Sequence, residues 1–328
     1  MNNTRTALLQ WLEQGSIPAN AVSTALRLAG VTPSKADWRT FFDSLMLWLA
    51  ATFCALGVIF FFAYNWQAIG ELAKFGLLEL LIIGSLCLCW RLDLNATTGK
   101  SALLFAALLI GALLALVGQT YQTGADTYEL FTVWAIAILP WVLVSCFSAL
   151  WLFWLGLINV AAILYYQLFG GFFGILFNFD EILWAIFTLN TVAWAVRELV
   201  AVLTQFDWLA ERWSARVLAV VSGGIISTMA IFAIGDIHND SIQASLLVYP
   251  VWMGLAYTVY RHILLDVFVL AGGVLSGIIF ITVWLTEKMM NNKMDEAGVF
   301  LFIGFVIIGL SALGGFWLKS VAQGGHHE

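Results

Sequence analysis

Charged residues are scarce in this chain. Only 14 lysines and arginines and 20 aspartates and glutamates occur among its 328 residues, so charged residues make up 10% of the sequence. Hydrophobic residues make up 62%, and the mean hydropathy is +0.93. A soluble domain of this length needs a polar surface, and this chain lacks the residues to make one. The composition therefore excludes a soluble globular protein.

Cysteine is rarer still, with four residues in the chain. Cys87 and Cys89 are two residues apart and point to different faces of a helix, which favours neither a disulfide nor a metal pair. The segment 326–328 (His-His-Glu) could hold a metal weakly, but we expect a disordered tail there. There is no phosphate-binding glycine motif, no metalloprotease motif and no basic patch. We therefore expect no metal, no cofactor and no nucleic-acid partner.

Long apolar stretches dominate the sequence. A helix needs about 20 apolar residues to cross a hydrocarbon core of about 30 Å, and about ten stretches are long enough. The fold class expected is all-α: a polytopic transmembrane helix bundle with a short N-terminal cytoplasmic helical hairpin. Tryptophans near the ends of the stretches, such as Trp134 and Trp252, are expected to anchor in the headgroup layer. The expected spans are 42–64, 70–91, 100–119, 128–147, 148–169, 181–203, 215–235, 243–260, 262–285 and 297–318.

Basic residues are distributed unevenly between the two sides of these spans. If loops alternate sides, eleven lysines and arginines fall on one side and three on the other. Short loops rich in lysine and arginine stay in the cytoplasm, so we expect both termini to be cytoplasmic. The basic side carries Arg5, Arg27, Lys35, Arg39, Arg91, Lys100, Arg197, Arg212, Arg216, Arg261 and Lys319, and the opposite side carries Lys74, Lys288 and Lys293.

Three regions are expected along the chain. Residues 1–40 have the pattern of a cytoplasmic helical hairpin, with Pro18 in the first turn of its second helix and Gly30 at the end. Helices this short need a docking surface, on this chain, on the membrane or on a partner. Residues 41–155 form a first transmembrane region, and residues 156–328 supply the C-terminal transmembrane helices.

The most unusual local stretch is GQTYQTGADTYE at 118–129, which joins the third and fourth spans on the outward side and holds no basic residue. One interpretation is a polar site at the outer membrane boundary. The other is structural: Asp126 and Glu129 have the spacing of a capping box, Gly124 suits a positive φ, and Gln119 can satisfy helix-end carbonyls. Capping explains the other polar side chains less well. The candidate site comprises Glu71, Glu79, Gln119, Tyr121, Gln122, Asp126, Tyr128 and Glu129.

Glu79 lies about eight residues inside the second span, or about 12 Å from its start. An ionised carboxylate at that depth costs at least a few kcal/mol unless it is paired, protonated or in contact with water. Either a proton- or cation-linked site or a packing role fits this position. Glu71 lies two turns earlier and about 80° away, so both acids could line one outward-opening groove with the 118–129 stretch.

Small and polar residues within the later spans predict helix contacts. Gly273 and Gly277 in the ninth span, and Ser311 and Gly315 in the tenth, have the spacing for close helix approach, in this chain or in an oligomer. Asn159 and Asn190 lie in the middle of neighbouring spans and are expected to form an interhelical hydrogen bond. Asp266 is expected to pair locally with Arg261.

Three segments together carry a family resemblance. They are FFAYNW at 61–66, FGLLE at 75–79 and GQTYQTGADTYELF at 118–131. They resemble an uncharacterised bacterial membrane family catalogued as domain of unknown function 2157, over about residues 5–155. The resemblance implies a multi-pass protein of the bacterial inner membrane and supplies no activity, cofactor or catalytic residue.

Three hypotheses about function follow. The first is a non-enzymatic component that binds a membrane-protein partner or a second copy of itself among membrane lipids. The second is transport or lipid handling through an outward polar groove around Glu79 and the 118–129 stretch. The third is an enzyme acting on a lipid-linked substrate with Asp126 or Glu129 as general base, which an exposed loop disfavours because such a base needs a tuned pKa.

Overall fold

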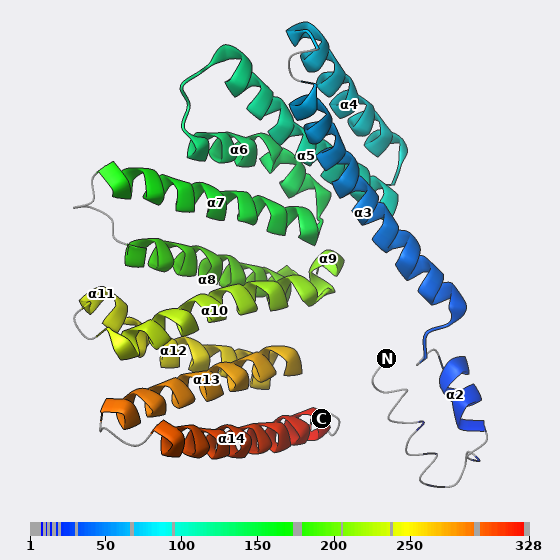
Figure 1. Cartoon of the computed structure of the whole chain (residues 1–328). Coiled ribbons are helices and arrows are strands. Elements are labelled where there is room, and N and C mark those ends of the chain that lie inside the picture. Colours follow the sequence, from blue (N-terminus) through cyan, green and yellow to red (C-terminus); the bar gives the residue numbers. More distant parts are fainter. Residues whose placement is uncertain are drawn as a thin grey trace. The chain divides into compact units, whose positions relative to one another are not determined.

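A computed structural model describes residues 8, 11, 14, 18, 21–29, 32–65, 69–93, 96–172, 179–204, 206–236, 239–291 and 296–324. The described chain is helical, without a strand in these ranges, and ten of its helices are long and apolar enough to cross a membrane (Figure 1). The expected all-α bundle of about ten spans is thereby confirmed. The chain separates into two compact units, Met1–Trp154 and Leu155–Glu328, which are described in turn.

The first unit contains α2 (Val22–Leu28), α3 (Lys35–Tyr64), α4 (Glu71–Arg91), α5 (Thr97–Tyr121), α6 (Thr127–Ser145) and the start of α7 (Ser148–Phe172). α5 packs against α3, α4 and α6. Small residues along α5 allow this close packing: Ala106 and Ala107 have no exposed surface, and Trp134 lies against Gly111 with its indole N–H donating to the Ala107 carbonyl at 2.8 Å. Trp134 is therefore a packing residue, and the prediction of a headgroup anchor was wrong for it.

The N-terminal region is only partly covered by the described residues. Of the expected hairpin at 1–40, the second helix is present as α2, while Arg5, Gly30 and most of the first helix lie outside the described residues. Ser34 caps α3: its hydroxyl accepts from the Asp37 N–H at 3.2 Å, and the Asp37 carboxylate accepts from the Ser34 N–H at 2.7 Å. This capping box starts the first span helix at Lys35, seven residues before the expected start at 42.

The fourth and fifth spans are separate helices. α6 ends at Ser145, α7 begins at Ser148, and Cys146 takes a left-handed conformation with a φ of 47° between them. A left-handed residue commonly ends a helix. Two residues are therefore enough to separate the spans, as the expected boundary at 147 and 148 required.

The second unit contains the rest of α7, the helix α10 (Trp213–Gly235) and seven further described helices. α10 packs against α8, α12 and α13, and α14 packs against α13. The central helices of the two units, α5 and α10, are buried to the same extent. In each of them 44% of the residues in an apolar 18-residue stretch are buried, against 28% or less for the other spans. The remaining elements are α8 (Phe179–Thr204), α9 (Asp207–Ala210), α11 (Asp240–Gln243), α12 (Ser245–Thr258), the π-helix η2 (Val259–Ile263), α13 (Val267–Asn291) and α14 (Glu296–Gly324).

Only part of the small-residue packing predicted for the last two spans is found. A Cβ added at Gly273 would lie 3.2 Å from the Met253 side chain, which marks a close contact between α13 and α12. Gly277 and Gly315 have open space where a Cβ would be, and Ser311 is exposed. The close approach of α13 and α14 is instead at Gly314, where a Cβ would lie 2.5 Å from Val274. The residue of α14 that faces α13 is therefore one position from the predicted one.

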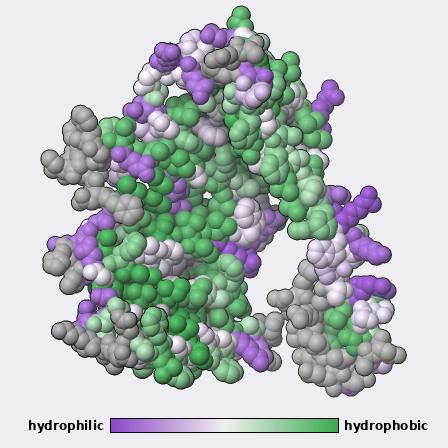
Figure 2. Space-filling model, viewed as in Figure 1, coloured by the Kyte–Doolittle hydropathy of each residue, from purple (hydrophilic) through white to green (hydrophobic). Residues whose placement is uncertain are grey.

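Both units expose broad apolar surfaces (Figure 2). Large side chains such as Phe53 of α3, Leu80 of α4 and Phe316 of α14 are 64–74% exposed. A soluble protein rarely leaves such surface uncovered, whereas lipid tails cover it at no cost. The structure is thus that of an integral membrane protein.

Candidate functional site

The turn from α5 to α6 forms the polar stretch at 118–129. Gln122 ends α5 in the left-handed conformation with a φ of 45°, and Gly124 follows with a φ of 66°. The Asp126–Glu129 capping box opens α6. The Glu129 carboxylate accepts from the Asp126 N–H at 3.3 Å and from the Tyr128 hydroxyl at 3.4 Å. The expected cap and the expected positive φ at Gly124 are both present.

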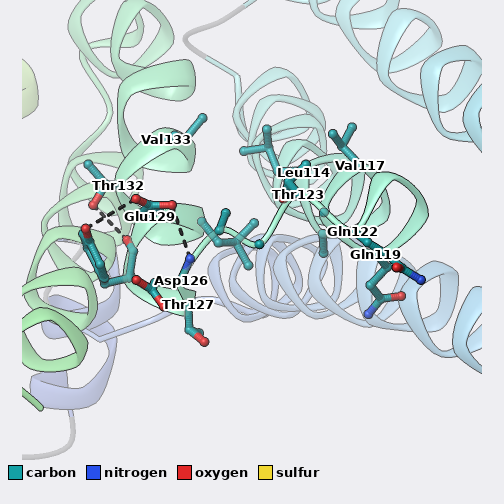
Figure 3. Close-up of a pocket in the computed structure, with 16 residues that line it drawn as sticks. Leu114, Val117, Gln119, Gln122, Thr123, Asp126, Thr127, Glu129, Thr132 and Val133 are labelled. Atoms are coloured by element: carbon teal, nitrogen blue, oxygen red, sulfur yellow. Dashed lines mark hydrogen bonds between the residues drawn. The ribbon is translucent and has the colours of Figure 1, made fainter. Parts of the chain in front are cut away.

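A groove of about 820 Å³ lies along this turn (Figure 3). Figure 3 shows the amide side chains of Gln119 and Gln122 at one end and the carboxylates of Asp126 and Glu129 at the other, so the two sets do not converge on one point. Among its lining residues there is no lysine, arginine or histidine. The lining comprises Leu114, Ala115, Val117, Gly118, Gln119, Gln122, Thr123, Gly124, Ala125, Asp126, Thr127, Tyr128, Glu129, Leu130, Thr132 and Val133.

Three predicted site residues do not line this groove. The Tyr121 ring packs on Phe75 of α4, with 6.0 Å between the ring centroids. Glu71 and Glu79 are exposed residues of α4 and are absent from the groove lining. The prediction of a single groove holding both acids and the polar turn was therefore wrong. Residue spacing gives the angle between Glu71 and Glu79 around α4, but it does not tell which face of α4 packs against α5. That face contains the buried Leu78 and neither of the two acids.

The second unit contains a buried polar cluster that sequence reasoning did not find. Glu198 of α8 is 7% exposed. Its carboxylate accepts from the Tyr260 hydroxyl at 2.8 Å and lies 3.3 Å from Arg212 and 3.5 Å from Arg197. The Tyr260 oxygen in turn accepts from the Trp194 indole N–H at 2.7 Å. Three helical segments, α8, α10 and η2, are joined through this one carboxylate.

Asp266 connects a fourth segment to the same cluster. Its carboxylate lies 2.9 Å from Arg216 and 3.7 Å from Arg212, and it accepts from the Phe268 N–H at the start of α13 at 3.0 Å. The predicted local pair with Arg261 was wrong, because Asp266 turns toward α10. Arg197 completes the cluster by donating to the Leu209 and Glu211 carbonyls, each at 2.8 Å. The cluster holds together the ends of α8, α10, η2 and α13, and we refer to this end as the basic end of the second unit.

Two further predictions for the second unit had different outcomes. Asn159 and Asn190 bond to each other as expected: the Asn190 amide donates to the Asn159 side-chain oxygen at 2.6 Å. Trp252, expected as a headgroup anchor, is instead buried against Gly223 of α10. Residues 173–178, Lys293 and the His-His-Glu segment at 326–328 lie outside the described residues.

Comparisons with known proteins agree with the first unit and leave the second unmatched. No curated protein and no solved structure matches the chain. A family match covers residues 9–151, and its C-terminal limit lies three residues before the end of the first unit at Trp154. The resemblance expected over about residues 5–155 is confirmed. Residues 9–151 match the family described as "Predicted membrane protein (DUF2157)".

Proposed function

We propose that this membrane protein is an assembly component that binds a second membrane-spanning chain through the face of α4 that carries Glu79. One observation supports the proposal: the carboxylate of Glu79 is exposed on the side of a span helix, more than two turns from the start of that helix. Glu79 is eight residues beyond Glu71, the first residue of α4, which corresponds to about 12 Å. Among the described residues it has no hydrogen bond or ion pair.

Lipid tails cannot solvate such a group. A charged side chain at the centre of a bilayer costs about 2.5–3.5 kcal/mol by insertion measurements, and such residues face other helices or water. Leu72, Leu80 and Ile83 are 60–91% exposed on the same helix, so the carboxylate is surrounded by apolar surface. A single polar group in an apolar helix face is the arrangement by which membrane helices select a partner through an interhelical hydrogen bond.

The face also permits close approach. A Cβ added at Gly76 or Gly84 would meet nothing within 4 Å, so both glycines leave open space on α4. Gly76 lies one turn from Glu79, and small residues in a membrane helix let a second backbone approach closely. A second copy of this chain and a different membrane protein both fit this description, and stoichiometry distinguishes them.

Orientation belongs to the same proposal. The ends of the spans with most lysines and arginines face the cytoplasm, so the N- and C-termini are cytoplasmic, and the membrane is the bacterial inner membrane. The eleven-to-three bias supports this orientation. A cysteine introduced at Thr123, in a variant without the four native cysteines, should react with a membrane-impermeant thiol reagent from outside intact cells; labelling only after lysis would reverse the orientation.

Native mass spectrometry of gently extracted protein tests the partner. The wild-type chain should retain a second protein in fixed stoichiometry, Glu79→Gln should retain it because the amide still bonds, and Glu79→Leu should lose most of it. Glu71→Gln, at the helix end, is the matched control and should behave as wild type. Equal retention by Glu79→Leu and wild type, or a monomer in every sample, would overturn the proposal.

The groove at the α5–α6 turn favours a second candidate function, the uptake or handling of a cationic or hydroxyl-rich ligand, lipid headgroups included. Its lining offers two carboxylates and two amides and no basic side chain. Asp126→Ser separates the two roles of Asp126, since serine preserves an N-cap and removes the charge. Binding or transport of a cation that is lost in Asp126→Ser, at unchanged stability, would support this function; loss only in Asp126→Ala would leave the residue as a cap.

A further inference from the structure

A second groove lies within the second unit, away from α4 and the α5–α6 turn. It has a volume of about 790 Å³ and runs between α10, α12 and α13, with Trp317 of α14 at its edge. All four helices are candidate spans, so the groove is surrounded by lipid and its natural solvent is hydrocarbon.

Glycine creates the space. Gly224 of α10 and Gly272 of α13 line the groove, and a Cβ on either would meet nothing within 4 Å. Gly223 next to them supports the ring of Trp252, which a Cβ would approach to 2.7 Å. Gly223 thus lets the Trp252 ring pack against α10, and Gly224 and Gly272 leave the space beside it open.

The groove has the length of one leaflet. Its lining extends from Ala219 to Ile231 along α10, which at 1.5 Å per residue is about 18 Å. Half of a hydrocarbon core is about 15 Å. The lining begins six residues from the start of α10 and one residue from the start of α13, both at the basic end. Along α13 the lining ends about 18 Å from the basic end, at Ile279, and along α10 it continues to Ile231, about 27 Å from that end.

Three hydroxyls at the groove form one hydrogen-bonded chain, while the indole N–H of Trp252 in the groove wall is buried without a partner among the described residues. Ser227 donates to the Gly223 carbonyl at 2.5 Å, the Ser227 and Ser276 hydroxyls are 2.7 Å apart, and Tyr249 lies 2.8 Å from Ser276. Because Ser227 donates to the carbonyl, Ser276 donates to Ser227 and Tyr249 donates to Ser276. Each of these three hydroxyls has then used its one proton. Most of the other lining residues are apolar, which suits a hydrocarbon chain.

Positive charge stands at the basic end of the groove. The Arg216 guanidinium lies 5.6 Å from the ring centroid of Phe268, a lining residue, and its side chain is 43% exposed. Arg261 and Lys319 lie at the same end, and neither forms an ion pair with a described residue. Tyr257 and Trp317 are in ring contact there, at 6.0 Å between centroids, as aromatic residues at a membrane interface commonly are.

We propose that this groove is a lipid site that holds an acyl chain of an anionic phospholipid, with the headgroup phosphate at Arg216, Arg261 and Lys319. The length of the groove, its mainly apolar lining and the positive charge at one end together match this ligand. Basic pockets between membrane helices are known to select anionic headgroups through the same electrostatics.

Delipidated protein tests the site, with phosphatidylglycerol and phosphatidylcholine of identical acyl chains as probes and native mass spectrometry as the readout. The wild-type protein should retain phosphatidylglycerol over phosphatidylcholine. Gly272→Leu fills the groove and should reduce retention by about tenfold or more, because it displaces several buried methylenes. Gly277→Leu is the matched control: the same helix and the same open space, but outside the groove lining.

Charge is tested separately with the double variant Arg261→Gln and Lys319→Gln, against Lys288→Gln at the opposite end of α13. The double variant should lose the preference for phosphatidylglycerol, and the control should keep it. Equal retention of both lipids by wild type, equal loss in Gly272→Leu and Gly277→Leu, or a retained molecule that is not a phospholipid would each overturn the proposal. Thermal unfolding of each variant shows that a loss of lipid is not a loss of fold.

Discussion

The two polar regions of this protein differ in how far apart in sequence their partners lie. At the α5–α6 turn, Asp126 and Glu129 satisfy each other across three residues. At the basic end of the second unit, Glu198 bonds to Arg212, 14 residues away, and to Tyr260, 62 residues away. The bonds of the first region are local and cap the start of one helix. The bonds of the second region are tertiary contacts that join four segments of the chain. Removing a side chain should therefore have different consequences in the two regions.

Glu198→Gln is expected to give the largest effect. The change leaves Arg212 partly buried beside only one carboxylate, and breaking a buried pair by removing one partner costs about 3–5 kcal/mol. Denaturant unfolding of the detergent-solubilised protein, followed by tryptophan fluorescence, measures it. Glu129→Gln is the comparison in the other region and should cost much less, because glutamine also serves in a capping box. Equal losses in both variants would remove the distinction between the regions.

Tyr260→Phe should come next. The ring remains, but the Trp194 N–H and the Glu198 carboxylate each lose a partner, and leaving a buried polar group unsatisfied costs about 1–3 kcal/mol. Tyr257→Phe is the control, since Tyr257 is 43% exposed. The same unfolding measurement applies, and a neutral Tyr260→Phe would mean that the hydroxyl contributes nothing to the joint between α8 and η2.

Asp126→Ala should destabilise the first unit by about 0.5–2 kcal/mol, the usual cost of losing an N-cap. Asp126→Asn should recover most of that loss, because asparagine caps as well as aspartate. Hydrogen exchange at the first turn of α6 reports the change locally. If Asp126→Asn were as destabilising as alanine, the carboxylate charge itself would have to matter at this position.

The Asn159–Asn190 pair gives the smallest expected effect. Hydrogen bonds between membrane helices contribute about 0.6 kcal/mol on average and about 1.7 kcal/mol at most. The cycle of Asn159→Leu, Asn190→Leu and the double variant isolates the coupling between the two amides. A coupling energy of zero would show that each amide is satisfied by its own helix, through the Leu155 and Ile186 carbonyls.

The same difference in sequence distance explains what could be predicted. Ten spans, the capping box at Asp126 and the Asn159–Asn190 bond follow from length, local spacing and mid-span position. The partner of Asp266 did not, because Arg261 is closer in sequence while Arg216 is closer in space. Trp134 and Trp252 were misassigned for a similar reason: a tryptophan near the end of an apolar run looks like an interface anchor until the glycine it packs on, Gly111 or Gly223, is seen to face it.

The single groove predicted around Glu79 failed on a different point. Spacing gives the angle between residues of one helix, but the neighbouring helix decides which face is buried. On α4 that face contains Leu78 and Ile82, which pack with Leu109 and Leu116 of α5. Glu79, one residue from Leu78, is then exposed on the outside of the unit.

Synthesis runs from the N-terminus at about 5–20 residues per second, so the chain makes Glu198 several seconds before Tyr260. During that interval α8 is complete, and the Glu198 carboxylate has Arg197 and then Arg212 as partners while its bond to Tyr260 is absent. The order of synthesis therefore sets an order of assembly for the second unit. α8 and α10 can pair early, through Glu198 and Arg212. η2 and α13 join them only after Tyr260 and Asp266 have been made.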